Sequence, residues 1–366
     1  MLLLAAVSLM LAWVTWYWIE QPFRRKTRPV IASRRGVFTL GASVGAMLLA
    51  SGLFGVFSKR FEMSLDAKLV RYVEAVEDRA SDACNFDLNR PADFHPQPQC
   101  LSNGAPAIDV LLIGDSHMWS ISDEVRSELD KRNISYYSVS HTSCLPLFGF
   151  KIHDGPIVVE CEDFLRGAFS WATQNDVSTV VLAARFPLYL YGSRFDNGEG
   201  GVESGVDGWA DLTDVQTSNS DDAKRRKRVL LAYESRLRSL AEEFSIVLVY
   251  PIPEAGWDVP SYGFKNARFN GTDGSLSTSD EAYVARTKEV NSLFDRLVTE
   301  LPNVFAARVY EIFCKEGTGR CINADSGGVY YYDDDHLSNA GARLIAPLIV
   351  DSVEASLRGE SILGEE

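Results

Sequence analysis

An apolar run that breaks at Gly-Asp-Ser and continues into a helical pattern constrains this chain most. Residues 108–113 form a largely apolar run of strand length, Gly114-Asp115-Ser116 follows, and the next residues have helical periodicity. A side chain at the C-terminal end of a buried strand faces the crevice where open α/β sheets bind ligands. The N–H groups and positive dipole end of the helix point there too. Ser116 is therefore a candidate nucleophile beside a site for an oxyanion, although such triplets also form turns and helix caps.

A short acidic stretch near the C-terminus contains candidate partners for this serine. Asp333 and His336 lie three residues apart, so one loop or helical turn can bring the carboxylate and the imidazole together. A serine nucleophile needs a base, and the base needs an acceptor that holds its ring and tautomer. Among the five histidines, His336 alone stands in such an acidic setting ahead of a predicted helix. A solvated acidic turn is the alternative, but together with Gly-Asp-Ser the stretch predicts a Ser116–His336–Asp333 site.

These two motifs resemble those of a known enzyme family. Gly114-Asp115-Ser116-His117 with Asp333-x-x-His336-Leu337-Ser338 is similar to the SGNH (GDSL-type) hydrolases. More narrowly, the chain resembles the periplasmic SGNH domain fused to the C-terminus of acyltransferase-3 membrane proteins, which are bacterial O-acyltransferases that modify lipopolysaccharide and other surface glycans. The resemblance implies that Ser116 is the nucleophile and that Asp333 and His336 supply the acid and base.

The N-terminal sixty residues predict two membrane helices joined by a basic loop. Residues 1–19 are almost uninterruptedly apolar, and aromatic residues crowd their C-terminal end, as at a membrane interface. A cleaved signal peptide fits poorly, because there is no basic start and no small-residue cleavage site. Residues 17–24 resemble the ending of acyltransferase-3 membrane domains. Residues 36–57 are again apolar and uncharged, and their length suits a spanning helix better than a buried core helix.

Charge predicts the orientation of the chain. The intervening loop carries six positive charges, Arg24, Arg25, Lys26, Arg28, Arg34 and Arg35. The positive-inside rule places this loop in the cytoplasm and everything after Lys59 outside it. The chain has a net charge of −14, but residues 1–60 hold eight basic residues and one acid, or +7, so the remainder carries −21. Such an acidic soluble part argues against binding of nucleic acid or anionic headgroups.

The six cysteines agree with an extracytoplasmic location. All lie in the part placed outside the cytoplasm, where disulfides are permitted. Six cysteines allow 15 pairings, and we expect neighbours to pair. The expected pairs are Cys84–Cys100, Cys144–Cys161 and Cys314–Cys321. A zinc site is the alternative, but no C-x-x-C or His/Cys spacing supports it, and we expect neither a metal nor another cofactor.

The remaining pattern predicts a three-layer α/β domain with a parallel sheet, preceded by a connector. Strand patterns at 108–113, 134–140, 177–184, 246–252 and 304–310 alternate with helical patterns at 116–132, 164–174, 224–244, 279–301 and 340–357. Residues 151–162 look irregular. We divide the chain into membrane helices (1–60), a periplasmic connector (61–105, with a helix at 65–80) and an SGNH-like catalytic domain (106–366).

Arg185 is the main departure from the family pattern. Typical SGNH hydrolases carry an asparagine after the corresponding strand, where its side chain helps to bind the oxyanion. The second-block glycine is not obvious either, because residues 140–144 occupy that loop. The oxyanion site beyond the Ser116 N–H is therefore open. Arg185 either stabilises the oxyanion or binds substrate, or it is a structural arginine that pairs with an acid.

Two further segments carry chemistry of lower specificity. Residues 196–222 are rich in Gly, Asp, Ser and Asn, and predict a surface loop that also suits a glycan-contacting flap. Residues 224–228 are all basic and open a helix whose Leu231, Tyr233, Leu237 and Leu240 are expected to face the core. A charge run at a helix start is usually a solvated face, and we prefer that interpretation to a ligand site.

The resulting hypothesis is a membrane-tethered periplasmic O-acyltransferase of the bacterial inner membrane. It would transfer an acyl group, in the first instance acetyl, to a glycan hydroxyl, with the acyl donor delivered by an acyltransferase-3 membrane domain that is absent or truncated here. The expected partners are that donor, the glycan acceptor and the lipid bilayer, without nucleic acid. With water as acceptor, the same site is an esterase. A non-catalytic glycan-binding module and a structural subunit are the alternatives from other classes.

Overall fold

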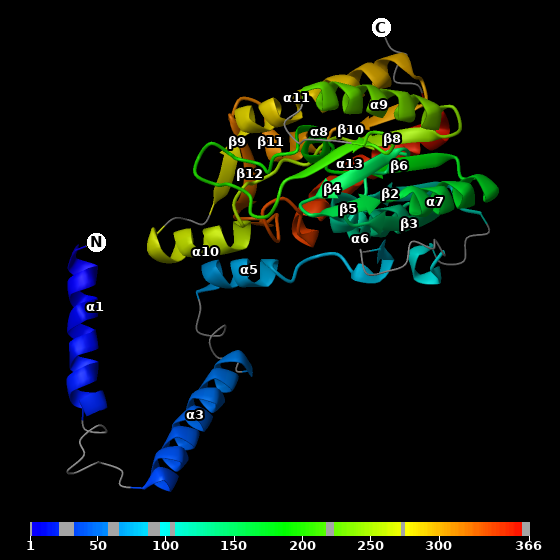
Figure 1. Ribbon diagram of the computed structural model, residues 1–366. Coiled ribbons are helices and arrows are strands. Elements are labelled where there is room, and N and C mark those ends of the chain that lie inside the picture. The colour runs from blue at the N-terminus through cyan, green and yellow to red at the C-terminus, as the bar shows by residue number, and fades with distance from the viewer. Residues whose placement is uncertain are drawn as a thin grey trace. The chain divides into compact units, whose positions relative to one another are not determined.

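The structure is a computed structural model of the chain. It describes residues 2–21, 33–57, 66–86, 96–102, 107–216, 223–271 and 275–360. The chain divides into two compact units, Met1–Leu65 and Asp66–Glu366. Both are drawn in Figure 1.

The N-terminal unit consists of apolar helices. α1 spans Leu2–Thr15 and continues into a π-helical turn, Trp16–Glu20, and α3 spans Arg34–Phe57. Among the described residues, one segment, Phe38–Gly55 of α3, is long and apolar enough to cross a membrane. The α-helical part of the first predicted span is shorter than a bilayer core requires, so the structure supports one candidate span where we predicted two. Residues 22–32, most of the predicted Arg-rich loop, lie outside the described residues.

A six-stranded parallel sheet forms the centre of the C-terminal unit. Its strands, in spatial order, are β1 (Asn85–Phe86), β3 (Tyr136–His141), β2 (Val110–Gly114), β6 (Thr179–Ala183), β8 (Ser245–Val249) and β10 (Val304–Ala307). Every neighbouring pair is parallel. The predicted α/β fold is therefore confirmed. β2, which precedes Ser116, lies between β3 and β6.

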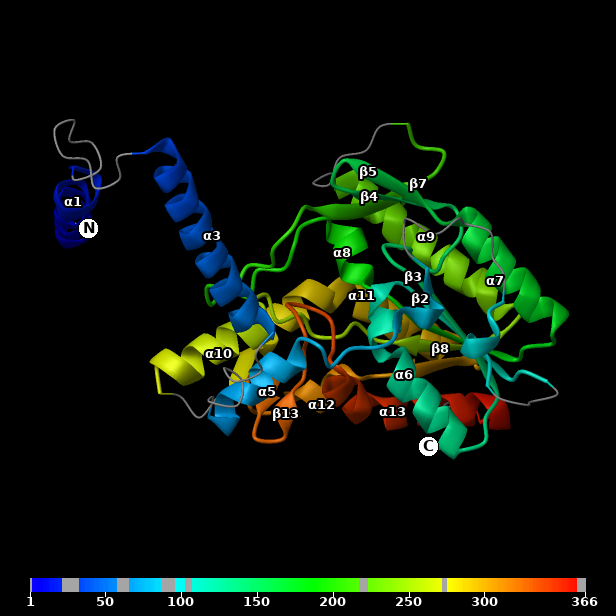
Figure 2. The same cartoon turned by 90° about the horizontal axis from the view of Figure 1, so that it is seen from below.

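Helices cover both faces of this sheet (Figures 1 and 2). One face carries α6 (Ser116–Lys131) and α13 (Asn339–Arg358). The other carries α7 (Glu162–Gln174), α9 (Ala223–Ala241) and α11 (Asp280–Glu300). Successive residues of a strand point to opposite faces, and β2 follows this rule, with Val110 and Leu112 in one apolar core and Leu111 and Ile113 in the other. The sheet is thus buried on both sides.

The C-terminal unit also contains a three-stranded antiparallel sheet. Its order is β5 (Ile157–Glu160), β4 (Phe150–Asp154) and β7 (Gly208–Leu212). The prediction that residues 151–162 are irregular is therefore wrong, and the predicted surface loop contains a strand. The sequence does carry a signal for strand β4. Buried Phe150 and Ile152 alternate with the more exposed Lys151 and His153, which is the period of a half-buried strand. Residues 217–222 lie outside the described part of the chain.

A second antiparallel sheet precedes the His336 loop. It contains β9 (Leu276–Ser279), β11 (Cys314–Lys315), β12 (Arg320–Asp325) and β13 (Gly328–Val329). Three helices that we did not predict complete the unit, α8 (Phe186–Tyr191), α10 (Val259–Phe269) and α12 (Tyr310–Phe313). The cysteines form the three expected disulfides, Cys84–Cys100, Cys144–Cys161 and Cys314–Cys321.

Two predictions for helix α9 are wrong, one on its basic residues and one on its core-facing residues. Arg225, in the basic run, is fully buried and donates to three backbone carbonyls, those of Tyr189, Leu190 and Ala210. Arg228 pairs with the buried carboxylate of Asp211. The prediction of a solvated basic face is thus wrong at Arg225, and the prediction that Leu231 faces the core is wrong, since 58% of that residue is exposed.

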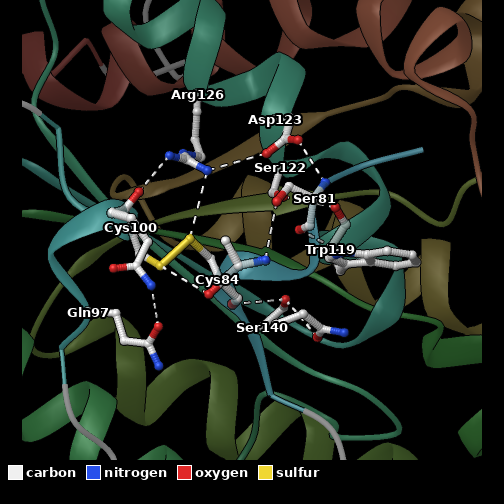
Figure 3. The surroundings of a disulfide bond; sticks show 12 residues. Ser81, Cys84, Gln97, Cys100, Trp119, Ser122, Asp123, Arg126 and Ser140 are labelled. Carbon is white, nitrogen blue, oxygen red and sulfur yellow. Dashed lines mark hydrogen bonds and ion pairs between the residues drawn. A yellow bond between two sulfur atoms is a disulfide. The ribbon is translucent and has the colours of Figure 1, made fainter. Parts of the chain in front are cut away.

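The segment before the sheet packs on the rest of the C-terminal unit. α5 (Ala67–Ala75), shorter than predicted, buries Leu69, Tyr72 and Ala75. Figure 3 shows how the Cys84–Cys100 disulfide lies beside α6, where Ser81 N–H donates to Asp123 (2.8 Å) and Trp119 Nε1 donates to the Ser81 carbonyl (3.0 Å). This segment therefore contacts the helix that begins at Ser116.

Candidate active site

The junction of β2 and α6 positions Ser116. Gly114 ends the strand where a Cβ would lie 1.8 Å from the Ala183 carbonyl oxygen, so no larger residue fits. Asp115 is the N-cap of α6, and its Oδ1 accepts from the backbone N–H of His117 at 2.8 Å. Ser116 is the first helical residue. Its backbone N–H is one of those without an intrahelical acceptor, as the sequence predicted.

Asp115 also fixes the neighbouring strand end. Its Oδ2 accepts from the backbone N–H of Arg185 (2.9 Å) and from the Tyr189 hydroxyl (2.7 Å). The residue is fully buried. A buried carboxylate is stable only when it is well hydrogen-bonded, and these three donors satisfy both oxygens. Asp115 therefore holds the start of α6 and the segment after β6 together, and leaves Ser116 facing the site.

His336 joins the two predicted halves of the site. Its Nε2 lies 2.8 Å from Ser116 Oγ, across 220 residues of sequence. Its Nδ1 lies 2.8 Å from Asp333 Oδ2, and its backbone N–H donates to Asp333 Oδ1 at 2.7 Å. The structure thus brings the three predicted residues together as a hydroxyl, a base within reach, and a carboxylate that orients the base.

A second carboxylate contacts the same imidazole. Asp335 Oδ1 lies 3.1 Å from His336 Nδ1. Its Oδ2 lies 3.0 Å from His117 Nε2 and 3.0 Å from an Nη of Arg185. Sequence reasoning did not assign Asp335 or His117 to the site. The sequence did carry a signal for both residues, because His117 follows Ser116 and Asp335 precedes His336.

Arg185 is buried among three carboxylates. Its Nε donates to Glu254 (2.6 Å), and one Nη contacts Glu203 (2.7 Å) and Asp335 (3.0 Å). The other Nη also contacts Glu203 and Glu254. A guanidinium has five N–H donors. Arg185 makes four hydrogen bonds, to Glu203 and Glu254, and its contact with Asp335 is an ion pair. These pairs with three buried acids favour the structural alternative over oxyanion binding.

A cavity of about 280 Å³ opens at Ser116 and His336. Tyr332 stacks on His336 with ring centroids 5.5 Å apart, and Trp119 meets Tyr332 edge-on at 5.9 Å. The volume lies just below the usual range for ligand pockets. The other lining residues include apolar and charged side chains, among them Ile152, Leu188, Tyr189, Asp154 and Arg194.

Comparison with known proteins identifies the family. The model of the SGNH domain (fused to AT3 domains) matches residues 83–351. The chain belongs to this family. A comparison with curated proteins finds no match. Among solved structures, the chain is similar to the periplasmic domain of the lipopolysaccharide acetyltransferase of Salmonella ser. Paratyphi A, with 13% identity and a TM-score of 0.43 over 80% of this chain and 99% of that one. It is also similar to a GDSL-like lipase from Parabacteroides merdae ATCC 43184, with 11% identity and a TM-score of 0.37 over 68% and 95%.

The carboxylates around His336 in this SGNH domain raise the pKa of its imidazole. Burial alone lowers the pKa of His336, but the carboxylates of Asp335 and Asp333 outweigh it and hold the pKa well above 6.5. Burial raises the pKa of Asp335, but Arg185 and His336 outweigh it and hold this pKa well below 3.8. Burial, Asp335 and Asp333 together raise the pKa of Asp334 to about 7. The neutral form of His336, which can accept a proton, is therefore more abundant at higher pH.

The partners of Arg185 in this SGNH domain come from distant segments. Glu203 lies in the predicted surface loop, and Glu254 follows β8. Each is further bound by a second arginine, Glu203 by Arg194 and Glu254 by Arg286. No local spacing in the sequence links these residues, so only the fold could reveal them.

Within the described residues, three groups of side chains have metal-ligating chemistry. They are His117/Asp335/His336, Glu203/Asp334/Asp335 and His141/Cys144/Cys161. The last contains a disulfide and offers no thiolate. In the first, the Asp335 carboxylate contacts both imidazoles, and in the second it and Glu203 pair with Arg185. These ligand atoms already have partners, and the expectation that no metal is needed stays a prediction.

Proposed function

We propose that this chain is a membrane-tethered O-acyltransferase whose SGNH domain works outside the cytoplasm. It transfers an acyl group, in the first instance acetyl, to a hydroxyl of a cell-surface glycan such as lipopolysaccharide O-antigen. The observation that carries the proposal is the 2.8 Å approach of Ser116 Oγ to His336 Nε2. At this distance the imidazole can take the hydroxyl proton as the oxygen attacks.

The first half-reaction would form an acyl-serine. Ser116 Oγ attacks the carbonyl carbon of the donor while its proton passes to His336 Nε2. The tetrahedral intermediate collapses, the bond to the leaving oxygen breaks, and that oxygen takes the proton from Nε2. The carboxylates at Nδ1 stabilise the imidazolium formed between these steps.

The oxyanion is expected to bind backbone donors at the start of α6. The Ser116 N–H lies at the first position of a sixteen-residue helix, where the dipole favours negative charge. The Arg185 guanidinium is occupied by Glu203, Glu254 and Asp335, so we assign it no role in oxyanion binding.

The second half-reaction would decide between transfer and hydrolysis. A glycan hydroxyl loses its proton to His336 Nε2 and attacks the acyl-serine. Collapse releases the glycan ester, and the proton returns to Ser116 Oγ. Water in place of the hydroxyl makes the same site an esterase. Transfer is supported by the fusion of this domain family to AT3 domains and by the apolar helix α3, and the three disulfides support a location outside the cytoplasm.

The test is acylation of a glycan by the full chain in detergent. Wild type and Ser116→Ala are incubated with p-nitrophenyl acetate, with and without lipopolysaccharide, and acetyl is followed on both glycan and water. Ser116-dependent acetyl on the glycan supports transfer. Ser116-dependent acetate in water alone, with every acceptor tried, supports the esterase. Equal behaviour of the two proteins overturns both and supports a glycan-binding module.

A further inference from the structure

His336 Nδ1 faces two carboxylates rather than one. Asp333 Oδ2 lies 2.8 Å away and Asp335 Oδ1 lies 3.1 Å away. A neutral imidazole that accepts a proton at Nε2 has a single N–H at Nδ1. Both carboxylates therefore compete for one donor, and their surroundings determine which of them holds the ring.

The two carboxylates have different environments. The Asp333 side chain is 29% exposed and bonds to N–H groups of its own turn, those of Asp335 and His336. The Asp335 side chain is 4% exposed and bonds to side chains from two other segments, His117 of α6 and Arg185 after β6. Asp333 is thus anchored locally and beside solvent, whereas Asp335 is anchored in the interior.

We propose that Asp335, held by Arg185 and His117, is a positioning residue for His336 on the buried side of the ring, and that Asp333 shares this task on the solvent side. The inference rests on the proposed function, in which His336 is the base. The Arg185 charge keeps Asp335 ionised, and His117 Nε2 donates to the same oxygen. Because water is excluded there, the attraction between Asp335 and an imidazolium is screened less than that of Asp333.

His336 is surrounded by further ionisable groups that any pH effect must include. Its own loop supplies Tyr332, Asp333 and Asp335, and α6 supplies Ser116 and His117. Arg185, Glu203 and Glu254 lie behind Asp335. Glu203 and Glu254 make four of the five contacts of Arg185, so Asp335→Asn removes the carboxylate at His336 and leaves Arg185 paired.

The experiment compares Asp333→Asn, Asp335→Asn and the double variant in the full chain in nanodiscs. We expect kcat/KM for p-nitrophenyl acetate to fall about tenfold, about 100-fold and about 10⁴-fold respectively. The His336 ring is also titrated by NMR with ¹⁵N-labelled histidine, which needs no turnover. Loss of a carboxylate near an imidazolium lowers its pKa, and we expect a fall of one unit or more in Asp335→Asn and a smaller fall in Asp333→Asn.

Asp334→Asn is the matched control, because Asp334 lies between the two carboxylates in sequence but bonds to Ser204 instead of His336. It should leave kcat/KM within about twofold of wild type. The inference is overturned if Asp335→Asn keeps the wild-type pKa of His336 while Asp333→Asn alone matches the double variant. A lower melting temperature without a change in this pKa also overturns it, since Asp335 would then be only structural. If the ring titrates as expected but no variant or wild type shows Ser116-dependent turnover, the proposed function fails and the positioning of His336 stands.

Discussion

The serine half and the histidine half of this site are built on different principles. Ser116 is held by its own neighbours, Gly114 and Asp115, at the end of a central strand. His336 lies in a loop and contacts the buried carboxylate of Asp335. That carboxylate is bound by His117 and Arg185, and Arg185 is bound in turn by two glutamates. The serine half therefore depends on the backbone of one strand–helix junction and its hydrogen bonds to the neighbouring strand end. The buried support of the histidine half is instead a network of charged side chains from several segments.

Because of this difference, loss of the nucleophile and loss of the charges near His336 should have separate effects. A change at the serine half should remove the nucleophile and leave the structure intact. A change at the histidine half should alter stability and the pH dependence of catalysis together, because the same charges serve both. Four measurements, beginning with the largest expected effect, test this division.

Ser116→Ala should abolish turnover without weakening the fold. Removal of a serine nucleophile costs about 10⁶-fold in kcat in a well-studied protease, and we expect a loss of at least about 10⁴-fold here. The assay is p-nitrophenyl acetate turnover with the melting temperature recorded alongside. Ser122→Ala, in the same helix, is the control, because Ser122 Oγ bonds only to the Trp119 carbonyl among the described contacts. Residual activity near wild type in Ser116→Ala would remove Ser116 from the mechanism.

Arg185→Met should destabilise the domain strongly. It leaves the carboxylates of Glu203, Glu254 and Asp335 without their shared cation, and breaking a buried ion pair in this way costs about 3–5 kcal/mol. Denaturant unfolding measures the effect. Arg343→Met is the comparison, because the Arg343 side chain is 63% exposed in its pair with Glu124 and such pairs contribute about 1 kcal/mol or less. Similar losses in both variants would contradict the buried-network interpretation.

The rate of wild-type turnover should increase with pH. Because the carboxylates hold the pKa of His336 well above 6.5, the neutral base becomes abundant only as pH rises through that elevated pKa. The acidic limb of kcat/KM for p-nitrophenyl acetate should therefore have its midpoint above pH 6.5. A midpoint at or below pH 6.5 would show that His336 is not the group that titrates, or that the two carboxylates do not act on it.

The smallest expected effect is a pH-dependent stabilisation by Asp334→Asn. The folded state raises the pKa of Asp334 from 3.8 to about 7, so the folded protein binds the extra proton and loses stability as pH rises between these values. Asp334→Asn removes the titrating carboxyl group, so the variant does not lose this stability as pH rises. Its melting temperature should therefore gain on wild type between about pH 4 and pH 7 and then keep a constant lead. A difference that does not vary with pH would place Asp334 in a solvated environment.

The predictable parts of the molecule were those specified by neighbours in sequence. The strand–Gly-Asp-Ser–helix junction, the Asp333–His336 spacing and the disulfides between nearest cysteines all involve short separations. The alternation of strands and helices likewise predicted the parallel sheet. Each of these features depends on local periodicity or on spacing within a few turns.

The parts that sequence reasoning missed depend on contacts between distant segments. The basic run of α9 was expected at the surface, yet Arg225 is buried, because backbone carbonyls from other segments accept from its guanidinium. For Arg185, a structural pairing with an acid was one of the predicted alternatives, but the acids that pair with it could not be named. Glu203 comes from a segment whose composition predicted a surface loop or a glycan-contacting flap, not a buried carboxylate. The β4–β5 hairpin was missed for a different reason, since its short alternation was present but was not recognised.

The segment that precedes the family match binds the start of helix α13, which follows the His336 loop. The Asp78 carbonyl accepts from the Asn339 N–H at 2.8 Å, and the Asp78 carboxylate accepts from the Ala340 N–H at 3.0 Å. These N–H groups begin α13, three residues beyond His336, whereas the family match begins only at residue 83. A version trimmed to residue 83 would keep Ser116, Asp333 and His336 and lose both hydrogen bonds to Asp78. A protein cut after Asp78 should therefore retain the proposed catalytic residues but hold the start of α13, and with it His336, less firmly.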